Sequence, residues 1–593
     1  MDVVQSPAKY GSDMMADVIR ALGIEYVALT PGSTIRGLHD SLVNYLGSHH
    51  PELITCCHEA IAISMAQGYA KVAKKPMMVM VHDTVGLLNA VNSIYSAWED
   101  QAPMLVIGGT GPMAIEKRRA WIDWVHTALV TGNLVRDFVK WDDQPFSMAS
   151  VPDSLLRAYR VATTEPQGPV YVCLDADLQE QVLNKEIPLP APERYRAPLP
   201  CQADPDTLDK VAELLVGAEH PIVIADYLGR NAEAVASLVT LADLLALPVI
   251  DACNRFNFPN NHPLDQTGGT AGVIHSGSEE DLLKEADVVL ALDVPDLWRS
   301  LAKVDFQSRE DRSMIPGTCK VIHITLHDLA PKSWSQSYGK LVPIDVPIAA
   351  DTAVALPAIT AACRAKLTES RRIQLQSRYA RLEARHRSLR KKWQEELDKS
   401  WHDCPISSAR LAAELGEVIK DEDWVLPHKT LQGWARRLWD WKKPHQYTGG
   451  PMGLGGGLGH SLGVALANRP YGRLCIDIQP DGDFLFTPAA LWTAAHHQIP
   501  LLVVMMNNHS YYNSEHHQEL TARQRGRSVE HRGIGTKLDS PNVDYAAMAR
   551  SYGLYGEGPI ENPDDFRPAL ERALRVVKEK KQLALIDVVT QNR

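Results

Sequence analysis

The first 185 residues alternate short, almost entirely apolar runs with helix-favouring stretches. The apolar runs read EYVALT, LITCC, PMMVMV, PMLVIGG and PVYVCL, and AIAISMAQGYAKVA is the clearest helical stretch between them. Near-continuous apolar strands that alternate with helices are typical of a parallel sheet covered on both faces. The pattern therefore predicts an α/β domain over residues 1–185.

The same alternation returns twice further along the chain. Residues 205–362 contain the apolar runs PIVIAD, PVIDAC, DVVLALD and KVIHIT, and residues 403–593 contain RLCIDI, PLLVVMM and LALIDVV. A proline-rich linker at 186–204 separates the first two blocks, and a charged, helix-favouring connector at 363–402 joins the last two. The predicted fold class is α/β, with three domains that each contain a mainly parallel, doubly wound sheet.

Charge and cysteine content exclude several classes of protein. A net charge of −11 without a basic stripe argues against nucleic acid as the main partner. The chain has no run of 18 or more apolar residues, and its first residues lack the basic and apolar regions of a secretory signal. Its nine cysteines form no CxxC pair, which favours free thiols and a cytoplasmic location. These features predict a globular protein with small-molecule ligands and no membrane partner.

Polar side chains follow the ends of two predicted strands in the third block. The first strand leads into PDGD, with Asp481 and Asp483 around Gly482, and Asn508 follows the next strand, 27 residues after Asp481. In parallel α/β sheets, ligands bind outside the carboxyl ends of the strands. Carboxylate, amide and carbonyl oxygens are hard ligands that suit Mg²⁺. A simple turn and a helix cap are the alternative, but the ordered pair favours a metal site.

This segment resembles the cofactor motif of the thiamine-diphosphate-dependent enzymes of the pyruvate oxidase/decarboxylase and acetohydroxyacid synthase superfamily, in which a GDG turn is followed by two asparagines. The resemblance implies that the side chains of Asp481 and Asn508 and the carbonyl of Ser510 hold Mg²⁺ against the diphosphate. It also places Gly482 and Asp483 at the cofactor.

The match to that motif departs at two positions. Pro480 replaces the first glycine, and Asp483 stands where many relatives have serine. An acid so close to a diphosphate must be turned away, protonated or hydrogen-bonded to the phosphate site. The residues leave these three alternatives open.

A second motif lies in the first block, where CHEAIAISMAQGYAKV resembles the segment that carries the family's activating glutamate. The resemblance implies that Glu59 contacts N1′ of the cofactor's pyrimidine and favours the imino form that removes the C2 proton. The cofactor would supply the carbon chemistry, while the protein positions and protonates it. Taken alone, a glutamate at a strand-to-helix turn is more typical of a helix cap.

The segment YTGGPMGLGGGLGHSLGVALA resembles the part of the family that holds the pyrimidine. By this resemblance, Gly450 offers its carbonyl and Met452 its N–H to the ring, and the Met452 side chain wedges the cofactor into a bent form. A dinucleotide-binding loop is the weaker alternative, because the G-x-G-x-x-G spacing is absent. Upstream, VLPHKTLQGW aligns with the segment that meets the diphosphate, which implies His428, Lys429 and Thr430 as cofactor-binding residues; ordinary surface polarity is nearly as good a reading of them.

Several stretches are most similar to the benzoylformate decarboxylases. VHDTVGLLNAVNSIYSAW places His82 at their active-site histidine, and TPGST places Ser33 at their substrate-binding serine. His126, in WIDWVHTALV, corresponds to a loop that lies near the cofactor in some relatives, and a histidine of near-neutral pKa can donate or accept a proton there. Candidates for the substrate-pocket wall, by position alone, are Trp298, Arg299, Tyr512, His516 and His517.

The family resemblance implies a decarboxylase or carboligase that acts on a 2-oxo acid. Protonation after loss of CO₂ would yield an aldehyde, and attack on a second carbonyl would yield an acetolactate-like product. In this family Glu59 and Asp481 of one chain serve different active sites, which implies an obligate homodimer, and tetramers are common. No FAD motif is identifiable, so FAD is not expected. A degenerate, non-catalytic relative is the alternative that Pro480 keeps open.

Overall fold

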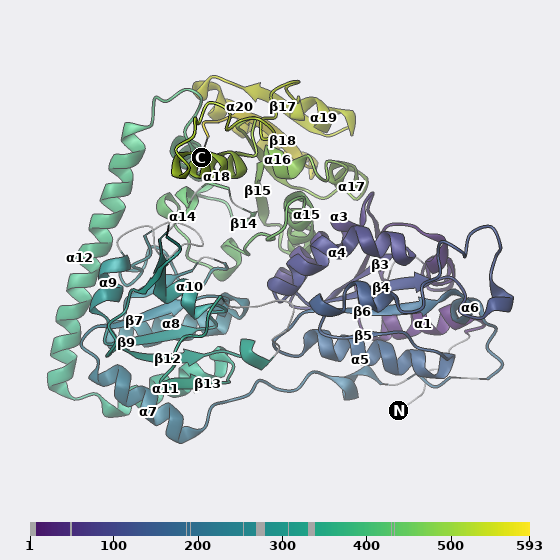
Figure 1. The fold of residues 1–593 in the computed structure, drawn as a ribbon, viewed down its shortest axis with the longest axis horizontal. Helices are drawn as coiled ribbons and strands as arrows, with labels where there is room; N and C mark the ends of the chain where they lie inside the picture. The colour runs from purple at the N-terminus through teal and green to yellow at the C-terminus, as the bar shows by residue number, and fades with distance from the viewer. Residues whose placement is uncertain are drawn as a thin grey trace.

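The computed structural model describes residues 8–47, 50–185, 187–189, 191–252, 254–268, 279–305, 308–329, 339–428, 430–431 and 433–592. It contains three α/β domains with a long helix, α12 (Glu369–Lys399), along the outer edge of the molecule (Figure 1). This confirms the predicted fold class of three domains with mainly parallel sheets. None of the helices in the described part of the chain has the length and apolar character needed to cross a membrane.

The first domain has a six-stranded sheet in the order β2-β1-β3-β4-β6-β5, and every pairing in it is parallel. Its central strands are buried on both faces, as the continuous apolar runs predict. Its strands are β1 (Tyr26–Leu29), β2 (Glu52–Thr55), β3 (Met77–Val81), β4 (Met104–Thr110), β5 (Asp142–Asp143) and β6 (Pro169–Asp175). Its helices are α1 (Gly11–Ala21), α2 (Arg36–Asp40), α3 (Glu59–Ala73), α4 (Asp83–Glu99), α5 (Val151–Thr163) and α6 (Ala176–Glu180).

The middle domain has a five-stranded parallel sheet in the order β13-β12-β9-β7-β8 and a separate antiparallel hairpin, β10-β11. Its strands are β7 (Pro221–Ala225), β8 (Val249–Asp251), β9 (Val288–Leu292), β10 (Ala302–Val304), β11 (Asp311–Ser313), β12 (Lys320–Ile324) and β13 (Val346–Ile348). Its helices are α7 (Pro205–Gly217), α8 (Ala232–Leu245), α9 (Glu279–Glu285), α10 (Leu297–Leu301) and α11 (Thr352–Lys366). The predicted charged connector corresponds to the end of α11 and to α12.

The third domain repeats the parallel arrangement, in the order β14-β15-β16-β18-β17. Its strands are β14 (Trp424–His428), β15 (Leu474–Pro480), β16 (Leu502–Asn507), β17 (Tyr555–Ile560) and β18 (Ala584–Val589). Its helices are α13 (Ser408–Ile419), α14 (Trp434–Leu438), α15 (Gly457–Asn468), α16 (Asp481–Phe484), α17 (Ala490–His496), α18 (Tyr512–Gln524), α19 (Tyr545–Ser551) and α20 (Phe566–Lys580).

The strand β16 links the cores of all three domains. Its alternate residues Val503 and Met505 belong to an apolar cluster that extends into the first domain, whereas Leu502 and Val504 belong to a cluster shared with the middle domain. Successive side chains of a strand point to opposite faces, so a fully apolar strand contributes to two cores at once. Because β16 packs in both cores, its position is fixed, and so is the sheet edge where Asn508 follows the strand.

Candidate active site

Glu59 is the first residue of α3 and is 5% exposed. The preceding residue, His58, starts the helix by accepting a hydrogen bond from the Ala60 N–H at its Nδ1 (3.0 Å). Asn89 of α4 donates its amide N–H to Oε2 of Glu59 (3.1 Å). A β-carbon on Gly86 would lie 2.8 Å from Oε1 of Glu59 and 3.3 Å from the β-carbon of His82. Gly86 therefore lets the carboxylate and the histidine lie side by side.

His82 directly follows β3, caps α4 and contacts two other loops of the first domain. Its Nδ1 is 2.9 Å from the hydroxyl of Thr34, and a β-carbon on Gly32 would overlap its ring. The ring centroids of His82 and His126 are 4.4 Å apart. Burial, together with the neighbouring His126, lowers the pKa of His82, so the neutral form is favoured. The hydroxyl of Ser33, on the same loop as Thr34, is buried without a partner among the described residues.

The loop after β4 places His126 beside His82. Arg119 donates to the buried carboxylate of Asp123 (2.8 Å), and the N–H of Gly111 donates to the carbonyl of His126 (2.6 Å). Nδ1 of His126 lies 3.6 Å from the Asp83 carboxylate, whose pKa burial raises. The structure thus brings together Glu59, Ser33, His82 and His126, the four residues predicted to be catalytic.

Asp481 opens the short helix α16, directly after β15. Its Oδ1 accepts a hydrogen bond from the Gly482 N–H (2.8 Å), and its Oδ2 is buried without a partner among the described residues. Burial raises the pKa of Asp481, while the N–H groups of Gly482, Ser510 and His509 oppose that rise. These opposing N–H groups place the carboxylate beside the 509–510 loop, as the metal-site prediction requires.

Asn508 follows β16, which pairs in parallel with β15, so that Pro480 lies opposite Met506. Oδ1 of Asn508 accepts a hydrogen bond from the Ser510 N–H (3.1 Å), which tightens the loop. His509 between them has a positive φ of 54°, a conformation that few non-glycine residues adopt. A buried carboxylate oxygen without a partner, next to a constrained amide and carbonyl turn, fits a divalent cation.

Asp483 is turned toward the glycine-rich segment rather than toward Asp481. Its two carboxylate oxygens accept hydrogen bonds from the N–H groups of Gly455 (2.5 Å) and Gly457 (3.2 Å) and from the amide of Gln479 (2.6 Å). Gly457 begins α15, where a negative charge is stabilised by the helix dipole. Protein donors therefore satisfy this acid, although the sequence left its surroundings open.

The segment expected to hold the pyrimidine packs on α4 of the same chain. The N–H of Met452 donates to the hydroxyl of Ser96 (3.1 Å), and Asn92 donates to the carbonyl of Leu454 (3.3 Å). The Met452 side chain is 65% exposed. The resemblance assigned this N–H to the cofactor, whereas here it is bonded to a serine.

Of the predicted diphosphate contacts, His428 ends β14 and its Nδ1 lies 3.5 Å from the carboxylate of Asp477. A β-carbon on Gly450 would lie 2.5 Å from the His428 ring, so the two segments touch. The hydroxyl of Thr430 is buried without a partner among the described residues. Lys429 lies outside the described residues.

The residues proposed for the pocket wall have other described contacts. His516 and His517 are exposed on α18, where Tyr512 stacks on His516 with a centroid distance of 6.0 Å. Trp298, on α10 of the middle domain, donates its indole N–H to Asp311 (2.6 Å). The sequence interpretation gave no role to Gln479 or Asp477, because a polar residue inside an apolar strand has no local motif.

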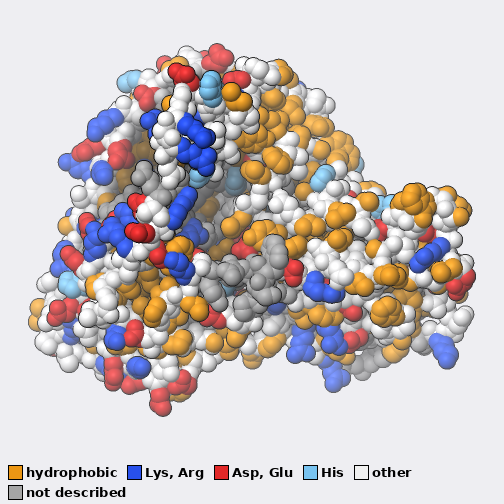
Figure 2. Space-filling model, viewed as in Figure 1, with side chains coloured by type: hydrophobic (Ala, Val, Ile, Leu, Met, Phe, Trp, Pro, Cys, Tyr) orange, Lys and Arg blue, Asp and Glu red, His pale blue; other side chains and the backbone are white. Residues whose placement is uncertain are grey.

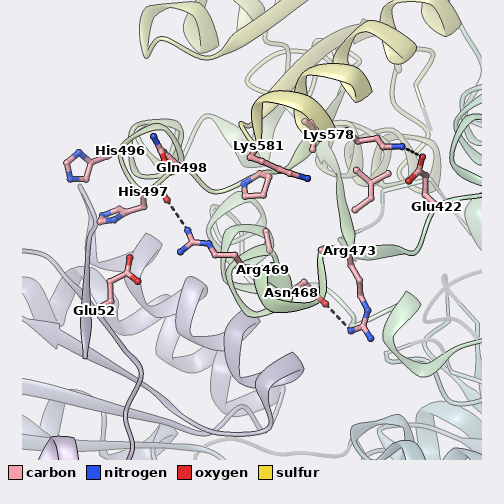
Figure 3. Close-up of a pocket in the computed structure, with 15 residues that line it drawn as sticks. Glu52, Glu422, Asn468, Arg469, Arg473, His496, His497, Gln498, Lys578 and Lys581 are labelled. Carbon is pink, nitrogen blue, oxygen red and sulfur yellow. Dashed lines mark hydrogen bonds and ion pairs between the residues drawn. The ribbon is translucent and has the colours of Figure 1, made fainter. Parts of the chain in front are cut away.

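A cavity of about 710 Å³ lies away from the candidate active site (Figure 3). Leu474 at the start of β15 and Pro500 just before β16 line it, so it lies at the edge of the sheet opposite to Asp481 and Asn508. Several of its polar side chains bind one another: Lys578 pairs with Glu422 (2.5 Å), and Arg469 donates to the carbonyl of His497 (2.9 Å). The cavity is therefore separate from the candidate active site.

Comparison with known proteins gives the same division into three parts. Models of the thiamine pyrophosphate enzyme N-terminal, central and C-terminal domains match residues 9–129, 208–359 and 430–588. The chain is 25% identical over 576 residues to a probable acetolactate synthase large subunit of Methanocaldococcus jannaschii, covering 95% of this chain and 90% of the relative. It is 26% identical over 534 residues to the mitochondrial acetolactate synthase of Schizosaccharomyces pombe, covering 84% and 74%.

Two solved structures share the fold over their whole length. The thiamine diphosphate-dependent 4-hydroxybenzoylformate decarboxylase of Rhodococcus jostii RHA1 has a TM-score of 0.76 at 21% identity, covering 98% of this chain and 99% of that one. The benzoylformate decarboxylase of Polynucleobacter necessarius has a TM-score of 0.76 at 19% identity, covering 99% of each chain. These likenesses show that the chain shares the fold of both proteins.

Proposed function

This chain belongs to the thiamine pyrophosphate (thiamine diphosphate) enzymes of the pyruvate oxidase/decarboxylase and acetohydroxyacid synthase superfamily, and we propose that it binds thiamine diphosphate with Mg²⁺ to decarboxylate a 2-oxo acid. The enzyme class is a thiamine-diphosphate-dependent 2-oxo acid decarboxylase or carboligase. The identities of the metal ion, of the 2-oxo acid donor and of the acceptor are part of this proposal.

One observation carries the proposed metal site: the buried, unpartnered Oδ2 of Asp481 beside the 508–510 turn. Asp481, Asn508 and the Ser510 carbonyl would hold Mg²⁺, and Thr430 would meet the diphosphate. Burial of the Oδ2 atom without a hydrogen-bond partner among the described residues carries a desolvation cost, which a divalent cation at this position would offset. When bound, thiamine diphosphate supplies the carbanion chemistry that breaks a bond beside a carbonyl.

The first domain would supply the proton-handling groups. Glu59, held by Asn89, would keep a proton at N1′ of the pyrimidine. Burial and His126 lower the pKa of His82, so the neutral form is favoured, and this imidazole would relay a proton from solvent to the carbonyl carbon of the donor. His126 lies beside His82 and would share this task, and Ser33 would orient the donor's carboxylate through its free hydroxyl. Overall, the bond between the donor's carbonyl carbon and its carboxylate breaks, CO₂ leaves, and a proton takes its place on the carbonyl carbon to give an aldehyde.

Carboligation is the second candidate reaction. The sequence relatives named above are acetolactate synthases, in which a second carbonyl compound takes the place of the proton. The paired imidazoles of His82 and His126 favour proton delivery, so we place decarboxylation first. A non-catalytic relative would lack cofactor binding altogether.

Exposed apolar side chains support an assembly of at least two chains. Val85 and Leu88 on α4 and Met452 and Leu454 on the adjoining segment are exposed, and Figure 2 shows hydrophobic side chains gathered on one face of the molecule. Apolar surface beside a candidate site marks an interface. We propose a homodimer, or a tetramer built from it. A cytoplasmic location, which the free described thiols favour, and the lack of FAD complete the proposal.

The decisive test is calorimetric titration of the dialysed protein with thiamine diphosphate and Mg²⁺, followed by measurement of CO₂ release from aromatic and aliphatic 2-oxo acids. We expect wild type and Glu59→Gln to bind the cofactor, and Glu59→Gln to lose at least about 100-fold in turnover. The exposed Glu116→Gln is the matched control and should retain activity. No binding by wild type would overturn the proposal, and binding with acceptor-dependent CO₂ release would favour carboligation.

A further inference from the structure

Lys71 is a fully buried lysine near the end of α3, with its side chain 1% exposed. Its ammonium forms an ion pair with Asp100, at the end of α4. It also donates a hydrogen bond to the carbonyl oxygen of Gly449 in the third domain (2.8 Å). The side chain therefore joins two domains through one nitrogen.

Asp100 is fixed by further donors from two domains. Gln67, one turn before Lys71 on α3, donates to the same carboxylate oxygen of Asp100 (2.9 Å). Arg255 of the middle domain donates to the Asp100 carbonyl (3.0 Å) and lies 3.6 Å from its carboxylate. The first and middle domains thus meet at Asp100, the third reaches its ion-pair partner Lys71 through the Gly449 carbonyl, and the ion pair has little freedom to move.

Gly449 occupies a backbone conformation that only glycine adopts easily. Its φ is +75°, and a β-carbon on it would overlap the carbonyl oxygen of Asn254. The Gly449 carbonyl and the Gly450 N–H belong to one rigid peptide plane. By holding that carbonyl, Lys71 sets the orientation of Gly450, which touches His428, and of the turn that leads to Met452.

A lysine is an unfavourable choice if packing were its only role. Burial lowers the pKa of Lys71 to about 8, with Asp100 opposing the shift and Arg255 adding to it. A hydrophobic residue of similar volume often replaces a buried ion pair without loss of stability. The lysine therefore has a use that depends on its N–H donors, and its described acceptor outside the ion pair is the Gly449 carbonyl.

We propose that Lys71 is a positioning residue that fixes the Gly449–Gly450 peptide of the 449–452 segment, and with it the Gly450 carbonyl that would receive the aminopyrimidine of thiamine diphosphate. The inference rests on the proposed function, because it assigns that segment to the cofactor. The same helix begins with Glu59, about 18 Å away at 1.5 Å per residue. One rigid helix would then carry the residue for N1′ of one active site at its start and the support of the pyrimidine segment of the other site near its end.

The test compares Lys71→Met, which removes the donors at similar length, with Lys71→Arg, which keeps them. Lys75→Met is the matched control, because Lys75 lies four residues later and pairs with Glu25 at the surface. Three properties are measured: the Kd of thiamine diphosphate at saturating Mg²⁺, the near-ultraviolet circular dichroism of the bound cofactor, and hydrogen exchange of the 449–452 amides without cofactor.

We expect Lys71→Met to weaken cofactor binding more than about tenfold, to alter the dichroism of the bound ring and to speed amide exchange of the segment. Lys71→Arg should recover much of the affinity, and Lys75→Met should stay within about twofold of wild type. A folded Lys71→Met protein with unchanged cofactor affinity and unchanged amide exchange would overturn the inference. Binding of thiamine diphosphate by wild type would in that case still support the proposed function. Absence of binding by wild type would instead refute the function itself.

If Lys71→Met fails to fold, Lys71→Gln is tested in its place, with the same expected tenfold loss of thiamine diphosphate affinity. Glutamine retains N–H donors without the charge, but it is too short to reach both the Asp100 carboxylate and the Gly449 carbonyl. A Lys71→Gln protein that folds and binds like wild type would overturn the inference. If neither variant folds, Lys71 is required for the stability of the whole protein, and the inference is overturned as well.

Discussion

The rings of His82 and His126 lie with their centroids 4.4 Å apart, although 44 residues separate them in the chain. Each imidazole has its own polar neighbour, because His82 contacts the hydroxyl of Thr34 and His126 lies near the carboxylate of Asp83. Two imidazoles this close disfavour simultaneous protonation. The neighbouring His126 therefore helps to keep His82 in its neutral form.

Replacing His126 should raise the pKa of His82. His126 is one of the two causes that lower this pKa, after burial, so His126→Gln removes part of the depression. The limb of the kcat/KM profile that belongs to His82 is identified as the one that disappears in His82→Gln. In His126→Gln we expect this limb to move to higher pH by about half to one unit. His402→Gln, at an exposed turn between α12 and α13, is the control. An unmoved limb would show that the two rings do not interact in solution.

Removal of the Asp481 carboxylate should abolish tight metal binding. In Asp481→Ala the cation would lose its charged ligand, and we expect the Kd of Mg²⁺, measured in the presence of thiamine diphosphate, to rise at least about 100-fold. Asp483→Asn is the matched variant two residues away. Its carboxylate already binds protein donors, so its Mg²⁺ affinity should change less than about threefold. Equal effects at the two positions would contradict the assignment.

Asp483 should contribute to stability rather than to metal affinity. In Asp483→Ala, the N–H groups of Gly455 and Gly457 and the amide of Gln479 lose their acceptor inside a buried region. We expect the free energy of unfolding, measured by urea denaturation, to fall by about 2–3 kcal/mol. Asp281→Ala, on the exposed first turn of α9, should stay within about 0.5 kcal/mol of wild type. A stable Asp483→Ala protein would mean that solvent reaches these donors.

The crossing of α3 and α15 should tolerate no side chain at Gly463. A β-carbon there would overlap the carbonyl oxygen of Met65 and lie 2.8 Å from the backbone nitrogen of Tyr69. Gly463→Ala should destabilise the protein by about 1–3 kcal/mol, because the two backbones must separate. Gly217→Ala at the end of α7, where a β-carbon meets nothing within 4 Å, is the control. Calorimetric melting of both variants measures the difference, and equal melting temperatures would refute the close approach.

His497 should make stability depend on pH in the acid range. Its Nε2 accepts a hydrogen bond from the Thr55 N–H (2.8 Å), and burial, with His496 and Arg469, lowers its pKa to about 4. The unfolded chain binds this proton near pH 6.5, so stability falls as the pH drops from about 6.5 to 4, and because solvent screens the partly exposed ring the loss is about 1–2 kcal/mol. Urea denaturation at several pH values should show a flatter dependence for His497→Gln than for wild type or the exposed His517→Gln. Parallel curves would contradict this.

Local sequence patterns were sufficient for the three-domain architecture. The apolar runs that became β3, β4 and β16 are buried on both faces, and such strands accept no other environment than a covered parallel sheet. The positions of Asp481 and Asn508 at the ends of adjacent strands followed from the same rule, because carboxyl ends of parallel strands share one edge. Lys429 falls outside the described residues, so its role stays a prediction.

The tertiary structure alone decided where the remaining polar groups point. Asp483 follows a motif that suggests a phosphate contact, yet its direction depends on Gly455 and Gly457, which lie more than 25 positions earlier in the chain. Lys71 has an ordinary place on a helix and acquires its partners only when Asp100 and Gly449 are packed against it. The sequence shows the hydrophobic pattern that predicts buried strands and helices, because this pattern is set by residues that are neighbours in the chain. Hydrogen-bond partners distant in the chain depend on how whole elements pack, and only the folded structure fixes that.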